Sequence, residues 1–332
     1  MALPAPLLEI IACAMTDTAP SKWCQAFFAI ATITALSVQL IPKASQSLLL
    51  DYGPRATQAK YGAPGDQAGW LYTSVRLVTA VQVPHSWFTH FYVASVAASA
   101  FWAYQYFAGR SLLLAIITKQ AAVEGPSMGK EQVWLVWILM ALQGGRRLFE
   151  CFYVMKPSRS KMWLGHWALG LIYYLDMSVA IWIEGSRMFH RMAPRLATNH
   201  AAGSLLHSEA DTAVSSGFST SQLVGIAIFT TGWLQQHKCH QYLASLKKYT
   251  LPEEGLFRHI VCAHYTCECL LYSGLAMAAA PAGRWFNRTL ICGLWFVIVN
   301  LGSTAHGTKK WYSEKFGEAK VEPKWKMIPF VF

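Results

Sequence analysis

Charged side chains are scarce in this sequence. Of its 332 residues, 14% are charged and 54% are hydrophobic, whereas a soluble domain carries roughly 25% charged residues. This shortage excludes an ordinary soluble domain and indicates an all-α, polytopic membrane protein. The net charge of +11 is assigned to loops at the surface of a lipid bilayer. No nucleic-acid partner is expected, because no basic stripe with interleaved aromatic residues stands outside the apolar runs.

Several motifs of soluble enzymes and metalloproteins are also missing. No G-x-G-x-x-G follows a strand and no phosphate-binding loop exists, so a nucleotide would not be held on a Rossmann unit. Histidines are spread singly or in loose pairs, which argues against the histidine boxes of a membrane di-iron enzyme. A His and Cys set around 237–240 and 262–267 has irregular spacing that matches no closed zinc pattern, so no metal is expected. No signal peptide is predicted at the N-terminus.

Long apolar runs are abundant instead. Most approach the ~20 residues that a helix needs to cross the hydrocarbon layer. The sequence therefore predicts seven transmembrane helices, at about 24–41, 87–107, 133–154, 163–183, 222–236, 257–280 and 289–306. With this division, 19 of the 28 Lys and Arg residues fall on the side that holds the C-terminus. That side is expected in the cytosol, with the N-terminus in the lumen.

The predicted organisation has two parts. Residues 1–80 form an N-terminal span and a cytosolic loop, and residues 81–332 form the main membrane unit. Within it, the polar stretch 184–221 is rich in Ser, Ala and Thr and is expected to be a lumenal loop.

The stretch 237–272 is the most informative, because it enters an apolar run while keeping ionisable side chains. His264 and Glu268 are four residues apart, so they share one face of a helix. Ionisable groups inside a lipid-spanning segment are costly and usually mark a site.

Polar residues at three further positions in the apolar runs each allow a functional and a structural interpretation. Arg146 and Arg147 suit an anionic ligand, because guanidinium matches phosphate, or they anchor the helix to lipid phosphates. Asp176 lies in mid-span and is either a paired buried residue or part of a cavity wall. His90 lies one turn inside the cytosolic edge, where it is a proton donor or a satisfied structural histidine.

The C-terminal span ends in polar residues followed by Lys309-Lys310-Trp311-Tyr312. Basic groups next to aromatic rings suit a phosphate-bearing cofactor with a ring to stack. They equally suit an interfacial anchor.

An ordered set of short motifs in this chain resembles the steroid 5α-reductase family. The set is RRLFE at 146–150, His240 with Leu243 and Leu246, Pro252 with Gly255 and Phe257, His264-Tyr265 with Glu268, Trp311-Tyr312, and Ile328-Pro329-Phe330. The stretch 83–92 is similar to the polyprenol/polyprenal reductase branch, which forms dolichol. The similarity is dense over 237–332, patchy from 83 to 175, and absent before about 80 and across 184–221.

The resemblance implies a seven-helix protein of the endoplasmic reticulum membrane that uses NADPH to reduce a C=C bond conjugated to a carbonyl. In relatives, the cofactor lies in a cavity that faces the cytosol. By position, its contacts carry over to Arg146, Arg147, His240, Lys247, His264, Glu268, Thr308, Lys309 and Tyr312. Relatives usually carry a histidine where this chain has 308–310. Either a lysine takes over the phosphate contact, or His306 substitutes for the histidine, or activity is weakened.

The implied substrate is a long-chain isoprenoid, polyprenal or polyprenol, on the route to dolichol and protein N-glycosylation. Gly144 stands where the steroid branch has a tyrosine, which argues against a steroid. An aldehyde is favoured over the alcohol, because hydride addition needs a carbonyl oxygen to receive the charge and a donor beside it. His90 is the first candidate for that catalytic donor and Tyr92 the second. Two alternatives remain, a very-long-chain enoyl-CoA or other enone reductase of the same fold, and a non-enzymatic lipid-binding membrane protein.

Overall fold

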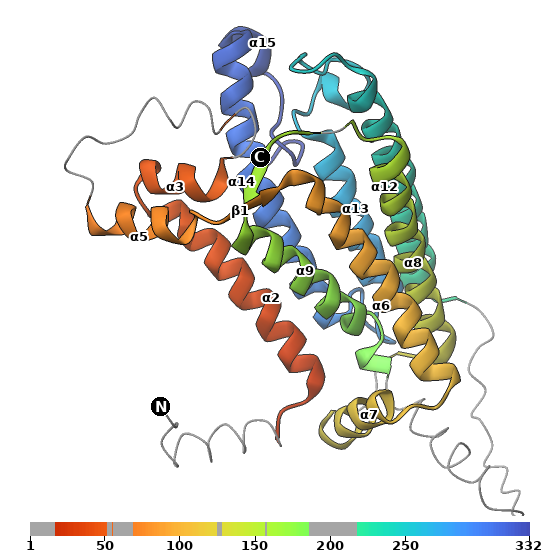
Figure 1. The fold of residues 1–332 in the computed structure, drawn as a ribbon. Coiled ribbons are helices and arrows are strands. Elements are labelled where there is room, and N and C mark those ends of the chain that lie inside the picture. The colour runs from red at the N-terminus through yellow and green to blue at the C-terminus, as the bar shows by residue number, and fades with distance from the viewer. Residues whose placement is uncertain (1–16, 52–54, 56–68, 125–127, 157, 186–217) are drawn as a thin grey trace, which may run out of the picture.

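The computed structural model describes residues 17–51, 55, 69–124, 128–156, 158–185 and 218–332, which form a mostly helical protein (Figure 1). The helices are α2 (Pro20–Ser37), α3 (Lys43–Leu50), α5 (Trp70–Val78), α6 (Thr89–Phe107), α7 (Ser111–Val123), α8 (Lys130–Tyr153), α9 (Leu164–Ala180), α12 (Thr220–Ser245), α13 (Ala263–Ala278), α14 (Arg288–Phe316) and α15 (Glu318–Val321). The strands are β1 (Gln82–Pro84) and β2 (Lys161–Trp163). The predicted helical fold class is confirmed.

Two predicted regions fall partly outside the described residues. The polar stretch 184–221 is described only at 184–185 and 218–221, and the N-terminal part lacks 1–16, 52–54 and 56–68. The expected lumenal loop and the division at residue 80 therefore stay predictions.

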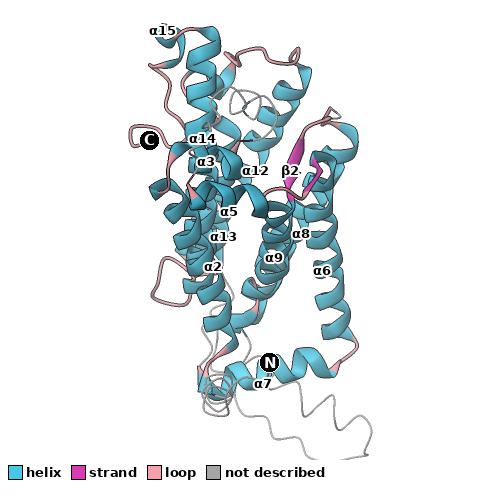
Figure 2. Cartoon of the chain, turned by 60° about the vertical axis from the view of Figure 1, so that its left-hand side comes forward, coloured by secondary structure: helices cyan, strands magenta, loops and turns pink. Residues whose placement is uncertain are grey.

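Three helical segments in the described part of the chain are long and apolar enough to cross a membrane: Pro20–Leu40, Leu164–Gly185 and Arg288–Phe316. They correspond to the first, fourth and seventh of the expected spans. The other expected spans fold as α6, α8, α12 and α13, which run beside them in one bundle (Figures 1 and 2). Figure 2 shows α7 lying across the end of this bundle that is opposite to α15. The chain is thus a membrane protein by its apolar helices, and the count of seven spans stays a prediction.

α12 and α13 approach each other closely because glycines lie where their backbones meet. A Cβ atom at Gly225 would lie 2.4 Å from the amide nitrogen of Ala278, and a Cβ atom at Gly274 would lie 2.3 Å from that of Phe229. Small residues of this kind let membrane helices pack backbone to backbone. This packing sets the C-terminal end of α12 next to the N-terminal end of α13.

The two strands hold the starts of α6 and α9 together. β1 and β2 pair antiparallel, with Val83 opposite Met162. The pairing is extended by a hydrogen bond from the Leu164 amide to the Val81 carbonyl, at 2.9 Å. Since each strand is followed closely by its helix, α6 and α9 begin at the same end of the bundle.

The C-terminal segment packs onto the loop that precedes α13. The amide of Val261 donates to the carbonyl of Trp325 at 2.8 Å, and the amide of Trp325 donates to the carbonyl of His259 at 2.8 Å. The ammonium group of Lys324 is buried and donates to the carbonyls of Pro252 and Phe257, both at 3.0 Å. These bonds fix the loop from which α13 starts.

Candidate functional site

Polar side chains from α8 and α12 gather around Glu150. Its side chain has 0% exposure. Both of its oxygens accept hydrogen bonds from arginines of its own helix, Arg146 and Arg147. The Nδ1 atoms of His237 and His240 each lie 2.7 Å from a Glu150 oxygen. Glu150 is therefore the carboxylate at the centre of this polar cluster.

Arg147 extends the polar cluster to α6. Its Nε and Nη2 atoms donate to the Tyr92 hydroxyl at 3.1 and 2.9 Å. Its Nη1 atom lies 2.8 Å from His240 Nδ1. A guanidinium presents its N–H groups in a rigid fork, which lysine cannot reproduce. Arg147 thus links α6, α8 and α12.

Arg146 extends the cluster to α13 through Gln236. Its Nη2 atom donates to the side-chain oxygens of Gln143, at 2.7 Å, and of Gln236. The amide nitrogen of Gln236 in turn donates to Glu268. Two guanidinium groups and two carboxylate groups, Glu150 and Glu268, are therefore connected in one network that spans α6, α8, α12 and α13.

Helical spacing explains why these side chains converge. Residues 143, 146, 147 and 150 recur at the three- and four-residue steps that keep side chains on one helix face, and so do 236 and 240 on α12 and 264 and 268 on α13. The same faces meet because α12 packs closely on α13.

Two nitrogen atoms of the polar cluster itself are buried and have no hydrogen-bond partner among the described residues. They are Arg146 Nε and His264 Nδ1. The His264 ring lies 5.8 Å from the His240 ring, centroid to centroid. Buried donors or acceptors without partners are rare in folded proteins, so these nitrogens are available to a bound ligand.

Burial also shifts the titration of His240, which lies beyond the apolar segment 222–236. Loss of solvent around the imidazole, assisted by the charge of Arg147, lowers the pKa of His240 to about 4. The ring is therefore neutral at pH 7 and adds no positive charge beside the two arginines.

Six of the sequence-predicted site residues lie in or beside this cluster: Tyr92, Arg146, Arg147, His240, His264 and Glu268. Gln143, Gln236, His237 and Glu150 also belong to it but were not predicted as site residues. Gln143 could have been noticed, because it is an uncharged polar residue one helical turn before Arg146 and Arg147, at the end of an otherwise apolar run.

The other predicted site residues lie elsewhere. His90 is exposed, with its ring 5.3 Å from the Trp87 ring and 6.1 Å from the Trp167 ring. Lys247 is exposed just after α12 ends. Both lie outside the polar cluster.

The predicted residues of α14 face the C-terminal segment. The ammonium group of Lys309 donates to the carbonyls of Glu322 and Lys324, at 2.9 and 2.8 Å. The Thr308 hydroxyl donates to the Thr304 carbonyl of its own helix. The Tyr312 ring lies 5.8 Å from the Phe316 ring in a small apolar cluster. As cofactor contacts, these three residues stay predictions.

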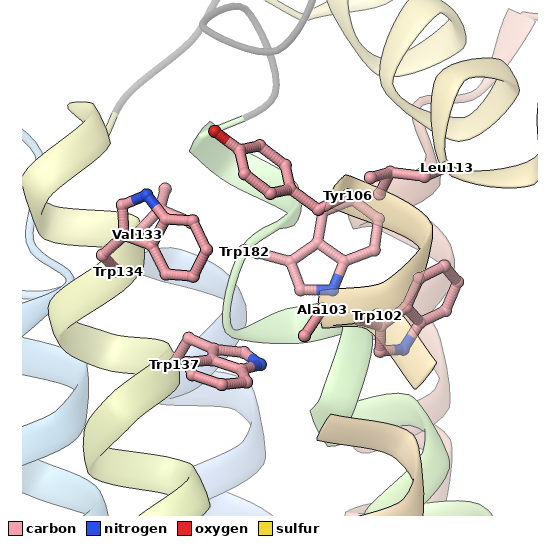
Figure 3. A pocket seen from close by; sticks show the side chains of 8 residues that line it. All are labelled: Trp102, Ala103, Tyr106, Leu113, Val133, Trp134, Trp137 and Trp182. Carbon is pink, nitrogen blue, oxygen red and sulfur yellow. The ribbon is translucent and has the colours of Figure 1, made fainter. Parts of the chain in front are cut away.

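Two hollows adjoin α8. A groove of about 600 Å³ between α8 and α12 is lined by Arg146 and His237 at one end and by apolar side chains along its length. A small cavity of about 30 Å³ lies at the opposite end of α8 and is lined by aromatic and aliphatic side chains (Figure 3). Only the groove borders charged groups of the polar cluster.

The chain is similar to known proteins over most of its length. A family model described as 3-oxo-5-alpha-steroid 4-dehydrogenase matches residues 198–332. Polyprenal reductase 1 of Arabidopsis thaliana is 30% identical over 253 residues, which cover 70% of this chain and 77% of the relative. Polyprenal reductase 2 of Oryza sativa subsp. japonica is 29% identical over 287 residues, which cover 75% of this chain and 79% of the relative. Polyprenal reductase of Saccharomyces cerevisiae is 30% identical over 198 residues, which cover 59% of this chain and 64% of the relative.

The region matched by the family model includes α12, α13 and α14, and therefore the α12 and α13 residues of the polar cluster. The relatives extend the similarity beyond that region toward the N-terminus, since the rice protein covers 75% of this chain. The chain therefore belongs to the steroid 5α-reductase family, in its polyprenal reductase branch.

Proposed function

We propose that this protein reduces the C=C bond next to the carbonyl of a polyprenal, giving the saturated aldehyde from which dolichol is made. The observation that carries the proposal is the 30% identity to a polyprenal reductase over 77% of that relative's length. The reaction class fits the chain's apolar helices, because an isoprenoid tail can stay in the lipid while only its polar head meets the protein.

The electron donor is proposed to be NADPH. A bound reduced nicotinamide supplies a hydride to the β-carbon of the conjugated system. The unpaired Arg146 Nε and His264 Nδ1 fit a ligand rich in phosphate and amide groups. Arg147, His240 and Glu268 would hold it from the same cluster, and Lys247, Thr308, Lys309 and Tyr312 are the further proposed contacts.

The proposed setting is the endoplasmic reticulum membrane, with seven spans and a cytosolic C-terminus. The excess of Lys and Arg on the C-terminal side supports this orientation. It places the polar cluster near the cytosolic surface, where a water-soluble cofactor can enter.

Of His90 and Tyr92, only Tyr92 belongs to the polar cluster, where we propose that it positions Arg147. Its hydroxyl accepts two hydrogen bonds from Arg147. We expect Tyr92→Phe to lower kcat roughly 10- to 100-fold, because Arg147 loses two hydrogen bonds that orient it. His90→Ala should keep kcat within about twofold, because the exposed ring contacts tryptophans outside the cluster. Steady-state kinetics on purified protein in lipid nanodiscs measure both. A large loss of kcat in His90→Ala, together with a normal kcat in Tyr92→Phe, would show that His90 and not Tyr92 matters for turnover.

The decisive assay compares substrates. Microsomes that lack the endogenous enzyme, supplied with this protein, should convert polyprenal to dolichal only when NADPH is added. NADPH should also raise the melting temperature, since a ligand bound to the folded state stabilises it by mass action. Reduction of a very-long-chain enoyl-CoA in place of polyprenal would assign a different reductase. Absence of both turnover and an NADPH-dependent shift would indicate a lipid-binding protein.

A further inference from the structure

Two tyrosines deeper in the bundle have hydroxyl groups without partners. Tyr173 on α9 and Tyr272 on α13 are 6% and 2% exposed. Among the described residues, neither hydroxyl group has a hydrogen-bond partner outside this pair. The rings meet edge to face, with centroids 6.2 Å apart. Even a hydrogen bond between the two hydroxyls would leave one O–H group without an acceptor.

Within the tyrosine pair, Tyr272 lies on the same face of α13 as the polar cluster. His264, Glu268 and Tyr272 follow one another at four-residue steps on α13, so they form a stripe on one helix face. The stripe runs about 12 Å along the helix axis, at ~1.5 Å per residue. It begins beside the buried arginines and ends at the tyrosine pair.

The surroundings of the pair are apolar. The Tyr173 ring lies 5.8 Å from the Phe28 ring and 5.3 Å from the Phe296 ring. Both tyrosines belong to the largest apolar core of the protein. A ligand that reaches these hydroxyls must therefore be mostly apolar and must carry an acceptor.

Stability gives no reason for hydroxyl groups at these positions. A buried hydroxyl without a partner loses its hydrogen bonds to water and gains none in return, so phenylalanine would be the more stable residue. Tyr92 shows the contrast, because its buried hydroxyl is bonded by Arg147. Groups that cost stability and sit next to a site are candidates for function.

We infer that the hydroxyls of Tyr173 and Tyr272 donate hydrogen bonds to the carbonyl oxygen of the substrate aldehyde. The inference rests on the proposed function. Addition of hydride at the β-carbon forms a C–H bond and moves the C=C electron pair toward the carbonyl oxygen. The two O–H groups stabilise the negative charge of the resulting enolate. A proton from water then adds at the α-carbon, the C=O bond forms again, and the saturated aldehyde leaves.

The chemistry of the pair matches this role better than a charged donor would. Phenol groups are neutral, so they can lie in an apolar region at rest. They become strongly favourable only when the oxygen gains negative charge, which is the condition for lowering the barrier. An aldehyde with a long hydrocarbon tail is also the kind of acceptor that can enter such a region.

The test uses Tyr173→Phe and Tyr272→Phe in the full-length protein in nanodiscs. We expect each change to lower kcat on polyprenal roughly 100-fold, the loss typical of removing one oxyanion donor. The melting temperature should stay equal or rise, and the NADPH-induced shift should be unchanged. Tyr106→Phe, a change of the same kind at the opposite end of α6, is the matched control and should keep full turnover.

The outcomes separate the two proposals. Wild-type protein that fails to reduce polyprenal defeats the proposed function. If the wild-type protein reduces polyprenal and both phenylalanine variants keep a normal kcat, the inference about the tyrosine pair is wrong and the proposed function stands. A loss of turnover accompanied by a lower melting temperature would assign the hydroxyls a structural role and would also overturn the inference.

Discussion

We expect Glu150→Gln to lower the free energy of unfolding by about 3–5 kcal/mol, the range found when one partner of a buried ion pair is removed. Glu150 is fully buried and accepts hydrogen bonds from both Arg146 and Arg147. Glutamine has nearly the same shape but no charge, so two buried guanidinium groups would lose the carboxylate they share. Thermal unfolding in detergent micelles, followed by circular dichroism, measures the effect.

Glu124→Gln is the matched control for this change. Glu124 pairs with Lys22 at 3.0 Å, but their side chains are 34% and 40% exposed. An ion pair in contact with solvent contributes about 0–1 kcal/mol, so the control should unfold almost like the wild type. Equal shifts for the two variants would show that the buried cluster does not depend on the charge of Glu150.

We expect Gly274→Leu to abolish folding. A Cβ atom at this position would lie 2.3 Å from the Phe229 amide nitrogen and 2.6 Å from the Gly225 carbonyl oxygen, both of them backbone atoms of α12. A side-chain rotation cannot relieve such a contact, so α12 and α13 would have to separate. Gly274→Ala should already cost about 1–3 kcal/mol, as overpacking does. Size-exclusion chromatography of the expressed protein, with melting temperatures for the alanine variant, measures both effects.

Gly145 provides the comparison, because it is also a glycine inside a helix. A Cβ atom at Gly145 would have no other atom within 4 Å. Gly145→Ala should therefore keep the fold and gain up to about 1 kcal/mol, because alanine favours the helix over glycine. If Gly274→Ala behaved like Gly145→Ala, the close backbone packing of α12 and α13 would be wrong.

Part of this architecture could be predicted from sequence because it depends on local spacing. The four-residue step from His264 to Glu268 predicts a shared face, and the structure places both beside the arginines of 146–150. Apolar length alone predicted helices at all seven expected spans. These features need no knowledge of which helices are neighbours.

The remaining features depend on contacts between distant segments. Gln236 was missed because its importance comes from Arg146 and Glu268, which lie on other helices. Tyr272 continues the α13 stripe, but its partner Tyr173 is about 100 residues away and shares no local pattern with it. The bonds from the Lys309 ammonium group to backbone carbonyls of the C-terminal segment were also missed. Sequence periodicity cannot supply such pairings.

The bonds between 259–262 and 325–326 have a consequence for the order of biosynthesis. The ribosome makes residues 325–326 after the described helices of the bundle, so α13 is made before the partners of its preceding loop exist. Until those partners arrive, the amides of Val261 and Cys262 lack their acceptors. The loop that leads into the His264 and Glu268 face is thus fixed only after residues 325–326 have been made.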